Sequence, residues 1–517
     1  MFKDSKLIQA SLLVITLSAL NKVTGFAKLF LAAEAFGTGA DADAMAAAWQ
    51  LPDVFFVMVS GGAMATALIP VYSAALVHRD KEYQQKLANT VLTTIALILG
   101  LLCLTAGIFA PWIARVVIVP DFDPAQQMLT ASLMRVALGG MFIFGLSSIL
   151  VSLLHSHQHF LAPSLGALLF DSGFVIGLWV GAERYGVQAM VWGGVLGICM
   201  HFVAQLYMIR RYKISLRPLL DFALPELREI LLLLWPRLIT LFALESVDIV
   251  IIRLASALPE GSTSAWFFAV LLTNMPVDLF GISLVITFFP TLSEEFNSHS
   301  LEKLHRSLET GLRYLWFFIV PSFVGLVALG PAGISVIMER GEFTAESTQI
   351  VYLLLVIAAS GAVAIATYEV LALLYFARHD TIRPMMIQVI SIAVGVGLNY
   401  MLVQPLGIYG LAFGRLAYTV TIVLLAWQVY RWRYQPLDER MLFKTFGRCL
   451  LSAGAMAIAI RLIATLELSQ LTFVILAIPA GVVVYGVVHY LSGGTAIIEI
   501  WQEVRNINRS SAHIGEN

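Results

Sequence analysis

The sequence predicts an all-α polytopic membrane protein of about fourteen transmembrane helices, built as two six-helix lobes followed by two C-terminal helices. Three observations support this. Apolar runs long enough to cross a bilayer recur along the whole chain, the two halves share a repeated pattern, and basic residues gather on one side of the predicted spans. Hydrophobic residues make up 59% of the 517 residues and charged residues 13%, whereas soluble domains carry about 25% charged residues.

The apolar runs give the helices in order. A helix needs about 20 residues to cross the hydrocarbon, and several runs are longer, so we expect tilt or interfacial extension. The predicted spans are 7–33, 44–76, 87–114, 127–154, 160–181, 186–209, 228–255, 265–292, 307–330, 346–377, 384–404, 407–430, 443–465 and 470–492. The first span exceeds the apolar core of a signal peptide, so we expect no cleavage.

Basic residues give the orientation of the spans. With the N-terminus inside, 21 Lys and Arg residues fall on inner segments, and only Arg115, Arg184 and Arg340 fall on outer segments. Positively charged loops stay on the cytoplasmic side of a membrane. We therefore expect an even number of helices and two cytoplasmic termini.

A repeated glycine pattern indicates a duplication. Residues 186–193 read GVQAMVWG and residues 407–414 read GIYGLAFG, at an offset of 221 residues. A second match, at an offset of 220, pairs Gly61 and Ile69-Pro70 with Gly281 and Phe289-Pro290. Six helices return the chain to its starting side, so an axis along the membrane normal should relate the lobes, and a binding site is expected between them.

The repeat divides the chain into five predicted parts. They are an N-lobe at 1–212, a cytoplasmic linker at 213–227, a C-lobe at 228–434, a C-terminal helix pair at 435–492 and a cytoplasmic tail at 493–517.

Ionisable residues inside the spans are expensive in hydrocarbon and mark cavities or partners. The first helix carries Lys22 and Lys28 with no acid between them, so a bound anion or acids of the other lobe would have to neutralise them. In the seventh helix, Glu245 and Asp248 lie on nearly one face. Other charges are expected to form structural ion pairs between helices: Asp171, Arg313, Glu369 and Arg461.

The sequence lacks the patterns of an enzyme. It contains no phosphate-binding loop, no clustered Cys and His metal set and no nucleophile elbow. The three cysteines have no paired spacing, and the basic residues sit at helix ends, so neither a metal site nor nucleic-acid binding is predicted. We expect no enzymatic activity and no bound cofactor.

Short motifs resemble the MurJ/MviN family of lipid II flippases. They include GFAK at 25–28, ADA at 42–44, LPD at 51–53, RGEFT at 340–344 and YFARHDT at 375–381. The likeness runs in register from about residue 10 to residue 434. It implies the fold of the multidrug/oligosaccharidyl-lipid/polysaccharide exporter superfamily and a place in the bacterial cytoplasmic membrane.

The departures from the family bear on the substrate. The resemblance implies cavity arginines that hold the diphosphate of lipid II, but two of these positions carry Lys22 and Lys28, and two others carry Phe56 and Leu271. Acidic positions of the family are occupied by Leu29, Gly61 and Asn274. Lysine does not reproduce the planar fork of arginine, so we expect weaker anion binding or another headgroup.

We predict two sets of site residues. The substrate, an anionic lipid-linked saccharide, is expected at Lys22, Lys28, Asp43, Asp53 and Asn274. A coupling cation, Na⁺ or H⁺, is expected in the second lobe at Glu245, Asp248 and Asn399. Membrane lipids and proteins of cell-envelope glycan synthesis are candidate partners.

Three functions remain open. The first is export of a polyprenyl-diphosphate-linked saccharide, lipid II or a related glycan, by alternating access. The second is a multidrug or small-solute antiporter of the same superfamily. The third is a non-transporting scaffold descended from a flippase, which the missing arginines favour.

Overall fold

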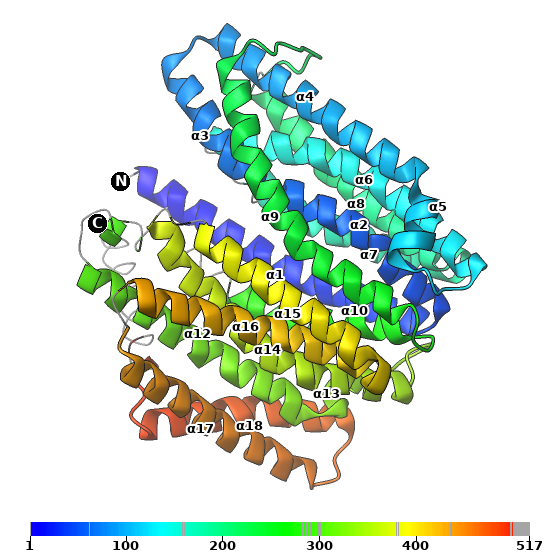
Figure 1. The fold of residues 1–517 in the computed structure, drawn as a ribbon, viewed down its shortest axis with the longest axis vertical. Coiled ribbons are helices and arrows are strands. Elements are labelled where there is room, and N and C mark those ends of the chain that lie inside the picture. Colours follow the sequence, from blue (N-terminus) through cyan, green and yellow to red (C-terminus); the bar gives the residue numbers. More distant parts are fainter. Residues whose placement is uncertain are drawn as a thin grey trace. The chain divides into compact units, whose positions relative to one another are not determined.

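The computed structural model describes residues 2–60, 63–157, 159, 161–212, 214–281, 284, 288, 292, 294–296, 301–378, 380, 382–434, 437–496 and 499. Every regular element in these ranges is a helix (Figure 1), as the sequence predicts. Eleven of the described helices are long and apolar enough to cross a membrane. These eleven helices agree with a total of fourteen spans. The exact number stays a prediction, because some predicted spans comprise two helices and others reach residues outside the described ranges.

Contacts divide the chain into two units: residues 1–264 with 338–347, and residues 265–337 with 348–517. The first unit contains α1 (Phe2–Phe36), α2 (Ala40–Ser60), α3 (Ala63–His78), α4 (Lys81–Ile108), α5 (Ala110–Trp112), η1 (Ile113–Ile118), α6 (Pro124–Ser156), α7 (Leu161–Tyr185), α8 (Val187–Arg211) and α9 (Pro225–Ala255). The sequence assigned the seventh span, α9, to the second lobe. By contacts it belongs to the first unit, because it packs against α2, α3 and α4.

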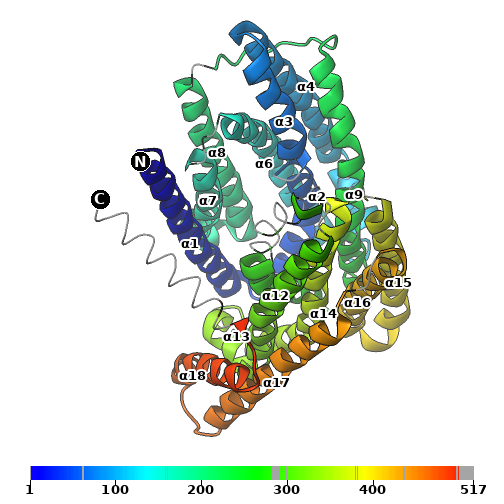
Figure 2. The ribbon, with the colours of Figure 1, turned by 90° about the vertical axis from the view of Figure 1, so that its left-hand side faces the viewer.

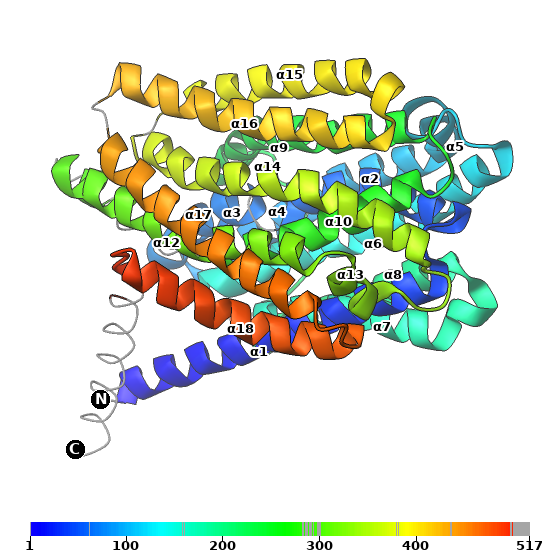
Figure 3. The ribbon, with the colours of Figure 1, turned by 90° about the horizontal axis from the view of Figure 1, so that it is seen from below.

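Most of α10 (Ser262–Pro276) and all later spanning helices belong to the second unit. These elements are η2 (Val277–Gly281), α12 (Leu301–Leu329), α13 (Pro331–Met338), α14 (Ala345–Ala377), α15 (Ile382–Leu406), α16 (Ile408–Arg433), α17 (Glu439–Ala464) and α18 (Gln470–Leu491). Within this unit α15 packs along α16, and α17 packs along both α12 and α18 (Figure 3).

The repeated glycines have the same structural role in both units. Gly186 precedes α8 with φ 55° and ψ −142°, and Gly407 precedes α16 with φ 56° and ψ −135°. This backbone conformation suits glycine because it has no Cβ. In each case the glycine joins two helices that pack side by side, α7 with α8 (Figure 2) and α15 with α16.

The second match of the repeat is only partly visible. Gly281 ends η2, and Pro70 lies inside α3. Gly61, Phe289 and Pro290 lie outside the described residues.

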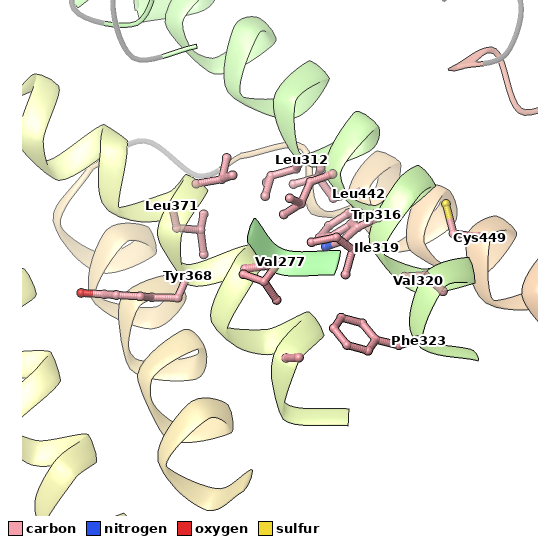
Figure 4. Packing of buried hydrophobic residues seen from close by; sticks show 14 of the residues in the cluster. Val277, Leu312, Trp316, Ile319, Val320, Phe323, Tyr368, Leu371, Leu442 and Cys449 are labelled. Atoms are coloured by element: carbon pink, nitrogen blue, oxygen red, sulfur yellow. The ribbon is translucent and has the colours of Figure 1, made fainter. Parts of the chain in front are cut away.

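Each unit has its own hydrophobic core. In the first unit, buried residues of α3, α4, α6 and α9 pack together, among them Tyr72, Leu87, Leu153 and Ile230. In the second unit, Trp316 of α12 lies among side chains from α14 and α17 (Figure 4). Its indole nitrogen donates to the hydroxyl of Thr367 at 2.9 Å, which satisfies the polar group inside the core.

The segment between α8 and α9 is fixed along α4. The backbone N–H of Arg217 donates to the side chain of Asn89 at 3.0 Å, and that of Leu219 donates to Thr93 at 3.0 Å. The Lys86 ammonium lies 2.6 Å from the Asp221 carboxylate. Positions 86, 89 and 93 lie on one helical face, so α4 holds this connection in an extended path.

Candidate functional site

Lys28, on α1, forms an ion pair with Asp171, on α7. The ammonium nitrogen lies 2.6 Å from a carboxylate oxygen, and the two side chains are 23% and 14% exposed. The carboxylate lies against Gly25, one turn before Lys28 on the same helix. The expectation that a ligand or the other lobe must neutralise Lys28 was wrong, because an acid of the same unit does so.

Aromatic rings surround this ion pair. Phe170 and Phe174 flank Asp171 on α7, and the Lys28 ammonium lies 6.0 and 5.0 Å from their ring centroids. An ammonium within about 6 Å of an aromatic face gains a cation–π attraction. Lys28 is therefore held by a carboxylate and two ring faces.

Phe56, on α2, continues the aromatic cluster. Its ring stacks on Phe144 of α6 at 4.7 Å and on Phe170 at 5.9 Å. The resemblance assigns an arginine to this position, but here the ring contributes apolar packing in place of a cation. Leu271, the second such position, lies half-buried on α10 in the second unit.

Two further acids belong to this region of the first unit. Asp53, on α2, is exposed, and the charges of Lys28 and Asp248 both act on it. Lys28 thus has the carboxylate of Asp171 in contact, and its charge also acts on Asp53, which in turn feels the charge of Asp248. Such a site is polar, and its acidic groups outnumber its cation.

Lys22 is exposed and forms no ion pair with any described residue. Six residues at about 100° each place it roughly 120° around α1 from Lys28. On a straight helix the two lysines therefore point in different directions, and Lys28 is the better-defined part of the predicted substrate site.

Asp43 has a structural explanation. It is 2% exposed, and its carboxylate accepts hydrogen bonds from the backbone N–H of Gly261 at 2.7 Å and of Ser264 at 2.6 Å. The Ser264 hydroxyl donates to it as well, at 2.7 Å. These are the contacts of a side chain that caps the start of a helix. Its role toward a substrate stays a prediction.

The remaining predicted residues do not share one unit. Glu245 and Asp248 lie on α9 in the first unit, and Asn274 and Asn399 lie in the second. Asn274 is exposed. Asn399 is fully buried where α15 crosses α16, and a Cβ on Gly414 would lie 1.8 Å from its side-chain oxygen. Contacts therefore do not group the three predicted cation ligands in the second lobe.

The sequence did not identify Asp171 as the partner of Lys28. It gave Asp171 only as a member of an unspecified ion pair. The available signal is the sequence Phe170-Asp171-x-x-Phe174, which puts two rings around one acid on a helix. Without the packing of α1 on α7, nothing linked that pattern to Lys28.

Comparisons with known proteins agree with this fold. Residues 32–484 match the family model described as "Lipid II flippase MurJ". A probable lipid II flippase MurJ of Bdellovibrio bacteriovorus is 26% identical over 389 residues, which cover 74% of each chain. The lipid II flippase MurJ of Burkholderia cenocepacia is 24% identical over 464 residues, covering 87% of this chain and 89% of that protein.

Solved structures share the fold. A lipid II flippase MurJ in an inward closed conformation matches with a TM-score of 0.79 at 21% identity, covering 93% of this chain and 98% of that one. An inward-facing multidrug resistance transporter of the MATE family matches with a TM-score of 0.66 at 16% identity, over 81% of this chain and 98% of that one. The family model covers most of the chain, and the protein is therefore a multi-pass membrane protein of the lipid II flippase MurJ family.

Proposed function

We propose that this protein moves a polyprenyl-diphosphate-linked saccharide, lipid II or a related lipid-linked glycan, across the bacterial cytoplasmic membrane by alternating access. The observation that supports this most strongly is the family match over residues 32–484. The task is transport and involves no enzymatic step. A charged, sugar-bearing headgroup does not cross about 30 Å of hydrocarbon unaided, because transfer of its charge out of water is too costly.

Lys28 is the proposed phosphate-binding group. Its ammonium is a point charge able to bind a phosphate oxygen, and in the structure it is paired with Asp171. Binding then exchanges one anion for another at Lys28, so the cost of holding an unpaired ammonium in the membrane is never incurred.

This exchange gives a reason for a coupling ion. A phosphate at Lys28 adds negative charge beside Asp171, Asp53 and Asp248, and like charges in a poorly solvated site repel strongly. We propose that Na⁺ or H⁺ enters with the substrate and offsets this charge. Of the predicted cation ligands, Asp248 is the one whose charge acts on Asp53.

The orientation is part of the proposal. Both termini are placed in the cytoplasm, and residues 38–42 and 330–347 on the outer side, from the distribution of basic residues. A membrane-impermeant thiol reagent added outside should label Ala345→Cys and not Arg433→Cys. The opposite labelling would invert the topology and contradict the proposed orientation.

The function is tested with purified protein in liposomes. Labelled lipid II, or a second polyprenyl-diphosphate glycan, is placed in one leaflet and its appearance in the other is followed. The parent protein should move at least one of them, Lys28→Arg should retain the activity and Lys28→Ala should lose it. Absence of flipping by correctly folded parent protein, for all such lipids, would favour the scaffold alternative.

A second candidate function is cation-coupled export of a small solute. Its support is the excess of carboxylates around Lys28, which suits a cationic solute better than a phosphate, together with the fold shared with the MATE transporter. Uptake of a cationic dye into the same liposomes, driven by a proton or Na⁺ gradient, would distinguish it from lipid flipping.

A further inference from the structure

A basic cavity lies between α12, α17 and α18 in the second unit, and none of its residues belongs to the site described above. Its volume is about 440 Å³. Four basic side chains line it: Arg313 of α12 and Arg440, Lys444 and Arg448 of α17. Figure 3 shows these three helices next to one another. The polar lining is completed by Asp438 at the N-cap of α17, Thr445 of α17, His489 of α18 and Thr495.

The cations of α17 form a stripe. Arg440, Lys444 and Arg448 are four residues apart, so they lie on one face of the helix. Like charges at this spacing destabilise a helix. Arg440 and Lys444 are exposed and Arg448 is half-buried, and none forms an ion pair with a described acid. Among the residues that line the cavity, one carboxylate, that of Asp438, accompanies these cations.

The nearby acids are already engaged. The Asp438 carboxylate accepts from the backbone N–H of Met441 at 3.0 Å and caps the start of α17. The Glu499 carboxylate lies 2.6 Å from the Arg313 guanidinium. Two buried nitrogens of the lining, Nε of Arg313 and Nδ1 of His489, have no hydrogen-bond partner within the described chain. The cavity therefore offers charge and buried polar groups to an anion from outside.

The same face of α17 becomes apolar beyond the cations. Leu451, Ile458 and Leu462 continue the stripe at helical spacing, and they are 63%, 64% and 63% exposed. From Leu451 to Leu462 the helix rises about 17 Å at 1.5 Å per residue. One helical face thus presents cations at one end and an exposed apolar surface along the rest.

We propose that this cavity binds the phosphate of an anionic phospholipid headgroup, with an acyl chain of that lipid along Leu451, Ile458 and Leu462. Basic pockets between membrane helices are suited to phospholipid headgroups. The apolar continuation favours a lipid over a free phosphate ion, since a free ion makes no use of it. The site is separate from Lys28, and the proposal does not depend on the transported substrate.

The test is lipid binding to the purified full-length protein in detergent, measured by native mass spectrometry with phosphatidylglycerol and, separately, phosphatidylcholine. The variant Arg440→Gln/Lys444→Gln/Arg448→Gln should bind phosphatidylglycerol on the order of 100-fold more weakly, because each cation contributes about fivefold near a lipid surface. Its binding of phosphatidylcholine should not change.

The matched control removes three cations at other helix ends, Arg210→Gln/Arg211→Gln/Arg433→Gln, and should bind phosphatidylglycerol within twofold of the parent. The exposed single substitution Arg440→Gln gives a graded loss if the triple variant does not fold. Equal binding by the cavity variants and the parent, or an equal loss in the control, would overturn the proposal. Competition by inorganic phosphate at the concentration of the lipid would also overturn it, in favour of a free phosphate site.

Discussion

The ammonium of Lys28 lies 2.6 Å from the carboxylate of Asp171, and the ring of Phe174 lies 5.0 Å from the same ammonium. This contact joins α1, the first helix of the chain, to α7. The aromatic cluster excludes water from one side of the ion pair, so the pair is stronger than one on the surface and more sensitive to the loss of either partner.

The first prediction concerns the stability of this pair. Lys28→Met or Asp171→Leu alone leaves the other charge half-buried and unpaired, which costs on the order of 3 kcal/mol. The double substitution should restore part of this loss, because it leaves no charge. Thermal unfolding of the four proteins in detergent measures the coupling. Additive losses in the double variant would show that the two side chains do not stabilise each other.

A second prediction concerns lipid II itself. Phe56 stacks on Phe144 and Phe170 where the resemblance implies an arginine, and a missing charged contact to a desolvated phosphate costs on the order of 2–5 kcal/mol. Expression of this protein should not rescue a bacterial host depleted of its essential lipid II flippase.

The matched variant in that experiment is Phe56→Arg/Leu271→Arg. It should restore at least partial growth, since it supplies both missing cations. Full rescue by the unmodified protein, with its presence in the membrane shown by immunoblot, would contradict the prediction that the substrate has changed.

The sequence predicted the helical class and the repeat because these depend on composition and spacing. Gly186 and Gly407 are visible as letters, and their equal φ and ψ values follow from the absence of a Cβ. The partner of Lys28 was not predictable in this way. Asp171 lies 143 residues away, and that contact exists only because α1 packs on α7.

The assignment of Asn399 to a cation site illustrates the same limit. An amide inside a span indicates a polar role, but the neighbouring helix decides which way the side chain points. Here a glycine of α16 leaves room for it. Asp43 is a similar case, because its three hydrogen-bond donors lie about 220 residues downstream.

A third prediction uses pH at the connection between α8 and α9. The hydrogen bond from Lys86 lowers the pKa of Asp221 below its ordinary value of 3.8, and the backbone N–H of Ala223 lowers it further. A depressed carboxyl pKa stabilises the folded segment above the unfolded value and is lost as the pH falls through the folded value. The contribution is therefore complete near neutral pH and disappears below about pH 4.

The measurement is hydrogen exchange of the backbone amides of Arg217 and Leu219 in Asp221→Asn at neutral pH. Loss of the Lys86 contact should speed their exchange, as acidification does in the parent protein after correction for the intrinsic rate. Glu82→Gln, on the same helix but in none of these contacts, serves as the control and should exchange like the parent. Unchanged protection in Asp221→Asn would show that Asn89 and Thr93 alone hold the segment.

The fourth prediction concerns the crossing of α15 and α16. A Cβ on Gly410 would lie 2.2 Å from the backbone oxygen of Leu402, whereas a Cβ on Gly414 would meet mainly the side chain of Asn399, at 1.8 Å. Both Gly410→Ala and Gly414→Ala should lower the thermal midpoint. Asn399→Ala should rescue Gly414→Ala in part, since it removes the atoms in the way, and should not rescue Gly410→Ala, because a backbone atom cannot be removed.

Gly397→Ala, on the facing helix α15, is the matched control, since a Cβ there meets nothing within 4 Å. It should leave the thermal midpoint unchanged or raise it, because alanine is the better helix former by about 1 kcal/mol. Equal tolerance of alanine at positions 397, 410 and 414 would mean that α15 and α16 do not approach closely. The two repeated glycine patterns would then share only the turns at Gly186 and Gly407, and not a close approach of the helices that follow them.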